Sequence, residues 1–296
     1  MNWLRPSLVG LDLTAREVVS RAIVAAVLGG GSSIQATDPS PAEPAAPLQI
    51  RLADEAGWGD ATPADVRAVL GAVADSIVPH VPDAPPIVLE VHARGGPISL
   101  FKRAPDGAIR VHLNTGGRLW SQYGYQFAHE LCHVLCRFDQ DDTGNRWFEE
   151  AMCEMASMFA LRRMAETWRD RPPYPNWRDY ASSHAAYAAR LIDEAQLPKG
   201  MSLAEWFSRH RNELVLQPTD RKNASVVAAS LLPIFEDQPS RLGAIHWLNA
   251  SSPPRPLTFE EHLAEWRSRV PLQRAETIDR IATTFGVSIR GRDEVK

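Results

Sequence analysis

The sequence predicts an α+β fold in which a small N-terminal lobe of helix and sheet is followed by an all-helical lobe. Runs rich in β-branched residues are confined to residues 86–115, whereas the chain after residue 147 shows helical spacing of apolar residues almost throughout. The 296 residues are 44% hydrophobic and 23% charged. This is a globular composition with enough length to bury a sizeable core.

Residues 1–48 are predicted to be a leader and a linker that precede the folded lobes. Arg21 is followed by about ten apolar residues and then by small residues that offer a cleavage site near Ala36, which resembles part of a secretion signal. The stretch before the run is long for such a signal and carries acidic residues. Residues 38–49 are rich in Pro and Ala, as in an extended linker. The pattern favours export, periplasmic or secreted, over the cytoplasm, and the run is too short for a membrane span.

The N-terminal lobe, residues 49–146, is predicted to begin with a helix and continue with strands. Thr62 is a suitable N-cap, and Pro63 suits the first helical position. Three strands are expected, at residues 86–93, 98–103 and 108–115. The turn residues 105–107, Pro-Asp-Gly, join the last two strands. Alternate residues of the last strand are apolar and are expected to face the core: Ile109, Val111 and Leu113.

A helix from Trp120 to about Phe138 is expected to end the first lobe, and a polar loop at residues 139–145 follows it. Residues 147–296 are then predicted to form the helical lobe, because Pro and Gly break the pattern into separate helical segments. These segments are residues 147–168, 177–195, 202–214, 222–235, 239–248, 258–269 and 272–285.

Charge and cysteine content exclude some classes of function. The formal net charge is −4 and the basic residues are scattered, so no nucleic-acid partner is predicted. The three cysteines are Cys132, Cys136 and Cys153. They are too few and too clustered for a disulfide framework.

The segment "FAHELCHVL", residues 127–135, contains the pattern H-E-x-x-H. His129 and His133 are four residues apart, so on a helix they share a face, about 40° from each other. Two imidazoles can then bind one zinc ion from consecutive turns. Glu130 lies about 100° from His129, where it can accept a proton from the zinc-activated water without binding the metal itself. The alternative is a coincidental spacing on an ordinary amphipathic helix.

A zinc enzyme of this kind needs a third protein ligand, and three sources are available. Asp139 would give a metzincin-like spacing, but Cys136 then occupies a position that calls for glycine. Cys136 itself lies on the same rigid helix as both histidines, where it is better explained as a packed thiol. The third source is the next helix, where Glu150 and Glu154 share a face and Glu149 is expected to point about 100° away. One of the two aligned carboxylates would bind the metal, and the other would accept a histidine N–H.

The H-E-x-x-H segment followed by "WFEEAMCE", residues 147–154, resembles the gluzincin branch of the zincin metallopeptidases. The resemblance covers about residues 86–165. It implies a zincin-like fold and one Zn²⁺ per chain, with Glu150 as the third ligand and Glu154 as an acid that orients a ligating histidine. Glu149 stands where many relatives have Asn. Two departures stand out: the interval from His133 to Glu150 is shorter than in familiar members, and position 151 is Ala, which some relatives have.

The resemblance also implies how a substrate would bind. In such enzymes the strand before the motif helix is the edge of the sheet and pairs with a bound peptide. Residues 108–115 would be this strand, and Asn114 would hold a substrate backbone group; the alternative is that Asn114 begins a turn. Relatives use a Tyr or His of the helical lobe to stabilise the oxyanion, for which His184, Tyr187 and His246 are the candidates.

The sequence therefore predicts a zinc-dependent hydrolase of peptide bonds whose partner is a peptide or protein substrate. His129, His133 and Glu150 would bind zinc, and Glu130 would act as the general base. Two alternatives remain at this point. One is a zincin-fold binding module without catalytic activity, and the other is a zinc hydrolase of non-peptide amides.

Overall fold

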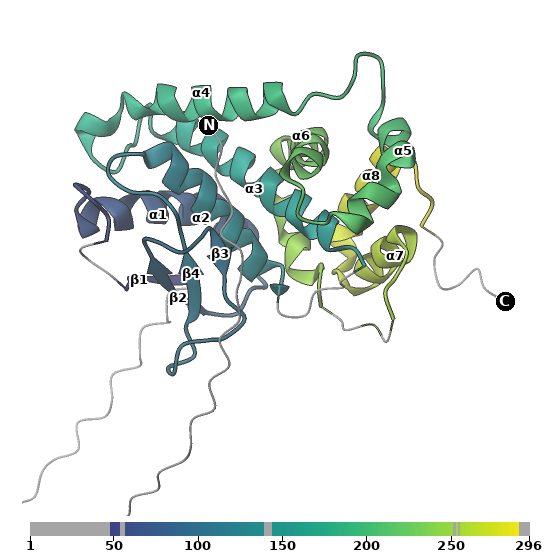
Figure 1. Ribbon diagram of the computed structural model, residues 1–296, viewed down its shortest axis with the longest axis horizontal. Coiled ribbons are helices and arrows are strands. Elements are labelled where there is room, and N and C mark those ends of the chain that lie inside the picture. The colour runs from purple at the N-terminus through teal and green to yellow at the C-terminus, as the bar shows by residue number, and fades with distance from the viewer. Residues whose placement is uncertain (1–47, 54–56, 139–143, 251–252, 254, 290–296) are drawn as a thin grey trace, which may run out of the picture. The chain divides into compact units, whose positions relative to one another are not determined.

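The computed structural model of the chain is a mixed α/β protein, mostly helical with one small sheet (Figure 1). The structure describes residues 48–53, 57–138, 144–250, 253 and 255–289. All of them belong to one compact unit of the chain, Pro44–Lys296. The predicted leader lies outside the described residues except for Leu48. Among the described helices, none is both long enough and apolar enough to cross a lipid bilayer.

The sheet contains four strands in the order β1-β2-β4-β3. Their bounds are Leu48–Leu52 for β1, Ile87–His92 for β2, Ile98–Ser99 for β3 and Ile109–His112 for β4. The three predicted strands are confirmed, although they are shorter than expected, and β1 was not predicted. Strands β1, β2 and β4 are parallel, and β3 pairs antiparallel with β4, with Ser99 opposite Val111. The predicted core residues of β4 are buried: Ile109, Val111 and the following Leu113.

The edge of this sheet is not the strand that the resemblance implied. Strand β4 lies between β2 and β3, so its backbone is already paired on both sides. The antiparallel edge beside the H-E-x-x-H helix is the short strand β3. The prediction that residues 108–115 form the edge is therefore wrong. The turn at residues 105–107 reverses the chain, so that β3 pairs with the side of β4 that would otherwise be the edge.

Three helices form the centre of the molecule: α1 (Pro63–Ile77), α2 (Trp120–Leu135) and α3 (Arg146–Thr167). Helix α1 begins as predicted, because the Thr62 side chain accepts from the Asp65 N–H and the Asp65 side chain accepts from the Thr62 N–H. Helices α2 and α3 pack against each other (Figure 1). Gly124 permits this close approach, since a Cβ there would lie 3.2 Å from the Met164 sulfur.

The remaining helices pack around α3. They are α4 (Tyr180–Glu194), α5 (Leu203–Leu216), α6 (Arg221–Asp237), α7 (Phe259–Arg269) and α8 (Leu272–Phe285), with short 3₁₀ segments η1 (Val78–His80), η3 (Pro175–Trp177) and η4 (Pro239–Trp247). The predicted helix at residues 239–248 is thus a 3₁₀ segment. Trp147 at the start of α3 packs 4.9 Å from Phe259 of α7 and 5.6 Å from Phe207 of α5, measured between ring centroids. This aromatic cluster fixes the end of α3 that carries the glutamates.

Candidate metal centre

Helix α2 presents the three residues of the H-E-x-x-H pattern to one cavity. His129 and Glu130 are buried, with 9% and 3% of their surface exposed. Both residues line a cavity of about 250 Å³ together with His133 and with Glu150 of α3. The spacing that predicted a shared face therefore places both imidazoles and the intervening carboxylate at the same opening.

Glu150 lies directly opposite the two histidines. Its Oε2 atom is 3.4 Å from His129 Nε2 and 3.7 Å from His133 Nε2. Zinc binds nitrogen and oxygen at about 2.0–2.2 Å, so two ligand atoms of a tetrahedral site lie roughly 3.4 Å apart. One nitrogen or oxygen atom from each of these three residues lies within 4.8 Å of the other two. The three buried or half-buried side chains are thus positioned to hold a metal ion, and they leave the cavity side open for a fourth ligand.

Glu154 stands behind His129, one turn further along α3. Its Oε2 atom is 3.7 Å from His129 Nδ1, which is within ion-pair distance but longer than a hydrogen bond. The same carboxylate accepts hydrogen bonds from the Tyr125 hydroxyl, at 2.6 Å, and from the Ser225 hydroxyl, at 3.3 Å. These contacts hold Glu154 on the side of the imidazole away from Glu150. The arrangement suits a carboxylate that orients a ligating histidine.

His133 has a carboxylate partner that the sequence reasoning missed. Glu149 Oε1 lies 2.5 Å from His133 Nδ1, and Asn249 Nδ2 donates to the other Glu149 oxygen at 2.5 Å. Glu149 is 4% exposed. The expectation that Glu149 points away from the site is therefore wrong. Helix α3 crosses α2 so that Glu149 and Glu150 reach two different nitrogens of the same imidazole.

A hydrogen bond from a serine of the sheet holds the Glu130 side chain in place. The Ser99 hydroxyl on the edge strand β3 lies 2.9 Å from Glu130 Oε2 and 3.3 Å from the Glu130 carbonyl oxygen. Ser99 is itself buried, at 7% exposure. A hydroxyl that donates to one carboxylate oxygen leaves the second oxygen available for a proton transfer. The sequence contains no local signal for this contact, because Ser99 precedes Glu130 by 31 residues.

The carboxylates change the protonation of both histidines in the absence of a metal ion. Burial alone would lower the pKa of His129, but the Glu150 and Glu154 carboxylates outweigh it and raise the pKa to about 9. Glu149 and Glu150 likewise raise the pKa of His133 well above its usual value against the effect of burial. Burial would raise the pKa of Glu150, but the two imidazoles hold it far below its usual range. This set of groups strongly favours a positive charge between them, either as protons or as a metal ion.

Of the other candidate ligands, Asp139 lies outside the described residues, and Cys136 is placed away from this site. Cys136 remains helical, with φ −75°, and the positive φ of +62° falls on Arg137 instead. The sulfur of Cys136 clusters with those of Cys132 and Cys153 rather than with His129 and Glu150.

The residues expected to contact substrate do not line the cavity. Asn114 is exposed, and its backbone N–H and C=O are both bonded to the Gln126 side chain. His184 is fully buried against Trp168 and Ser121, and burial lowers its pKa to about 4.

Tyr187 packs against Tyr125, with 5.9 Å between the ring centroids, and the guanidinium of Arg190 lies over its ring. His246 lies 3.2 Å from the Leu135 carbonyl oxygen at the end of α2. The polar residues that line the cavity from outside the metal-binding group include Thr219, Arg146 and Arg221.

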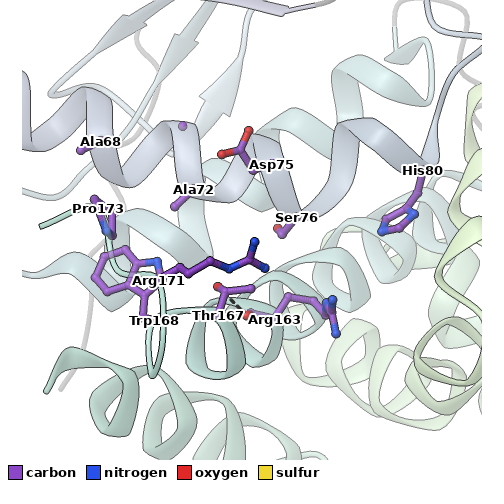
Figure 2. Close-up of a pocket in the computed structure, with 11 residues that line it drawn as sticks. Ala68, Ala72, Asp75, Ser76, His80, Arg163, Thr167, Trp168, Arg171 and Pro173 are labelled. Atoms are coloured by element: carbon purple, nitrogen blue, oxygen red, sulfur yellow. Dashed lines mark hydrogen bonds between the residues drawn. The ribbon is translucent and has the colours of Figure 1, made fainter. Parts of the chain in front are cut away.

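A second and larger cavity, of about 500 Å³, lies between α1 and the end of α3 (Figure 2). Arg171 extends along it, and Arg163 and His80 stand at its other end (Figure 2). Arg163 is already paired with the Glu166 carboxylate at 2.5 Å. The cavity contains none of the metal-binding groups described above, so the smaller cavity is the candidate functional site.

Replacing Glu149 by glutamine is expected to weaken metal binding at this site by about 10–100-fold, the usual cost of losing the partner of a ligating histidine. The neutral amide oxygen is a weaker acceptor than a carboxylate for the Nδ1–H of a ligating His133, and the amide NH₂ group competes with that of Asn249. Glu154→Gln is the matched comparison, and it should have a smaller effect because its carboxylate is 3.7 Å from His129 Nδ1. Competition with a chromophoric chelator measures both affinities. Unchanged zinc affinity in Glu149→Gln would contradict this role.

Comparisons with known proteins provide no family for the chain: no family model matches it, and neither a curated protein nor a solved structure is detectably similar to it.

Proposed function

We propose that the chain is a zinc-dependent peptide hydrolase with a zincin-like fold of the gluzincin type. The observation that carries the proposal is that four carboxyl groups surround the two histidines and occupy three different kinds of position. Glu150 faces both Nε2 atoms, Glu154 and Glu149 stand at the Nδ1 atoms of His129 and His133, and Glu130 is held apart by Ser99. A site built only for packing or for structural metal binding has no use for the separately held carboxylate of Glu130.

The cavity rim supports a peptide as the substrate. Strand β3 is a sheet edge, and its Ile98 is 46% exposed; Phe101, just after it, is 66% exposed. Both side chains line the cavity. An extended peptide can pair with a strand edge through its backbone while its side chains contact such apolar groups. Arg146 and Arg221 bring positive charge to the same rim, where a developing oxyanion needs stabilisation.

The proposed roles follow from these positions. His129, His133 and Glu150 would hold Zn²⁺, which when bound supplies Lewis acidity toward a carbonyl oxygen and a water molecule. Glu130 would accept the proton of the attacking water through the oxygen that Ser99 leaves free. It would then pass this proton to the nitrogen of the leaving amine. Glu149 and Glu154 would keep each imidazole in the orientation that directs Nε2 toward Glu150.

Turnover of a peptide library by the purified chain tests the proposal. We expect hydrolysis that a chelator abolishes, that zinc restores, and that a peptide hydroxamate inhibits. Bound zinc without any peptide turnover or hydroxamate inhibition would favour a binding module with a zincin-like fold. Turnover of non-peptide amides alone would favour a zinc hydrolase of non-peptide amides. Either result would contradict the peptidase assignment.

Zinc affinity is expected to fall as the pH is lowered from about 9. The pKa of His129 without a metal ion is about 9, so zinc must displace a proton at every lower pH. The apparent affinity should therefore fall about tenfold per pH unit for each proton displaced, whereas an unperturbed histidine shows this only below about pH 6.5. Chelator competition between about pH 6 and pH 9 measures the slope. A constant affinity above pH 6.5 would show that the carboxylates do not raise the histidine pKa.

A further inference from the structure

All three cysteines of the chain meet at one point between α2 and α3. The Sγ atoms of Cys132, Cys136 and Cys153 all lie within 4.8 Å of one another, and those of Cys132 and Cys136 are 3.8 Å apart. Each residue is 0% exposed. The cluster shares no residue with the group formed by His129, His133 and Glu150, although Cys153 also lies within 4.8 Å of ligand atoms of His133 and Glu149.

Helix geometry explains the cluster. Cys132 and Cys136 are four residues apart on α2 and share a face. Helix α3, packed against that face, supplies Cys153 from the turn after Glu149 and Glu150. Two sulfurs from one helix and one from its neighbour thus form a triangle in the dry interface between them.

We propose that this triangle is a second metal site, a three-coordinate thiolate site for Cu(I). Metal–sulfur bonds of about 2.3 Å place three sulfurs around a trigonal ion roughly 4.0 Å apart. The Sγ atoms of Cys132 and Cys136 are 3.8 Å apart, close to that separation, and no two of the three sulfurs are more than 4.8 Å apart. Thiolates are soft ligands, which favour Cu(I) and zinc over harder ions such as Mg²⁺ and Ca²⁺.

The number of donors distinguishes Cu(I) from zinc at this position. Structural zinc sites are almost always four-coordinate. His133 and Glu149 place ligand atoms within 4.8 Å of the Cys153 sulfur, but these two side chains are bonded to each other at 2.5 Å. With 0% exposure of the cysteines, solvent water does not reach the sulfurs to act as a fourth ligand. Cu(I) binds while the chain folds, when each thiol can still release its proton to solvent, and the copper stays Cu(I), so no oxidant or reductant is needed.

The two sites should be separable by mutation. The full chain is refolded without oxygen in the presence of Cu(I) buffered by a competing chelator, since the buried sulfurs are reached most easily before α2 and α3 close. We expect about one equivalent of Cu(I) in the wild type, and less copper in Cys136→Ala or Cys153→Ala at the same chelator concentration, because each variant keeps only two of the three thiolates. His129→Ala should keep its copper and lose zinc, whereas Cys136→Ala should keep its zinc. Equal copper in the wild type and the cysteine variants would overturn the proposal.

X-ray absorption at the copper edge of the loaded wild type tests the ligands without any variant, in case a cysteine substitution prevents folding. Three sulfur neighbours are expected at about 2.3 Å. Nitrogen or oxygen neighbours would place copper at the histidine site and refute the second site. The absence of bound copper, with three free thiols or with a disulfide, would refute it as well. The outcome is independent of peptide hydrolysis, which is measured on the zinc-loaded chain.

Discussion

Replacing Glu130 by glutamine is expected to abolish most peptide hydrolysis and to leave zinc bound. Glutamine has the same shape, and its amide oxygen can still accept the Ser99 hydroxyl, but it cannot take a proton from water. General acid–base catalysis typically contributes about 10²–10⁴-fold, so kcat should fall by at least about 10²-fold. The loss should appear in kcat rather than KM, because the proton transfer stabilises the transition state and not the bound substrate.

The comparison that isolates this effect is a charge-matched substitution far from the cavity. Glu194 on α4 pairs with Arg190 and is 61% exposed, so Glu194→Gln should leave kcat unchanged. Zinc content is measured on both variants before the assay. A Glu130→Gln enzyme with nearly unchanged kcat would remove Glu130 from the chemistry, and loss of zinc would assign it a structural role instead.

Replacing Glu150 by alanine is expected to have the second large effect, loss of zinc and with it all hydrolysis. The substitution removes the only carboxylate that faces both Nε2 atoms among the described residues. Loss of an outer-shell partner already weakens metal binding by about 10–100-fold, and loss of a ligand should weaken it further. Glu166→Ala on the same helix is the control, because Glu166 is 53% exposed and pairs with Arg163.

Thermal unfolding provides an independent measure of the same loss. Zinc at a hundredfold excess over its Kd stabilises the folded chain by about 2.7 kcal/mol. For a chain of this size, this corresponds to a midpoint roughly 5 °C higher. Addition of a chelator should therefore lower the midpoint of the wild type and of Glu166→Ala. The midpoint of Glu150→Ala should not respond to the chelator, and an equal response in all three proteins would contradict the ligand assignment.

The helices could be predicted from the sequence because their signals are local. The Thr62-Pro63 start and the apolar spacing of α2 and α3 lie within the segments that they define. The sheet order could not be predicted in this way. Strand β1 follows a Pro- and Ala-rich stretch, and its only strand partner among the described residues, β2, begins 39 residues later, with Leu48 opposite Ile87. Whether β3 or β4 forms the edge depends equally on contacts between separate segments.

In the candidate site, too, features with a local sequence signal could be predicted, and features that depend on contacts between separate segments could not. The i, i+4 spacing of His129 and His133 was enough to predict a shared face, and the structure places Glu150 opposite them. Glu149 was misjudged because a position on an isolated helix does not reveal how that helix crosses its neighbour. Ser99 and Asn249 were missed since they reach the site from 31 and 100 residues away from their partners.

Zinc content per chain is the measurement that tests the account most directly. The wild type and Glu150→Ala are purified side by side without chelator and their metal is quantified by elemental analysis. We expect about one equivalent of zinc in the wild type, as for a site with three protein ligands, and only a small fraction of that in the variant. A wild type without zinc, or equal zinc in the two proteins, would contradict the assignment of His129, His133 and Glu150 as its ligands.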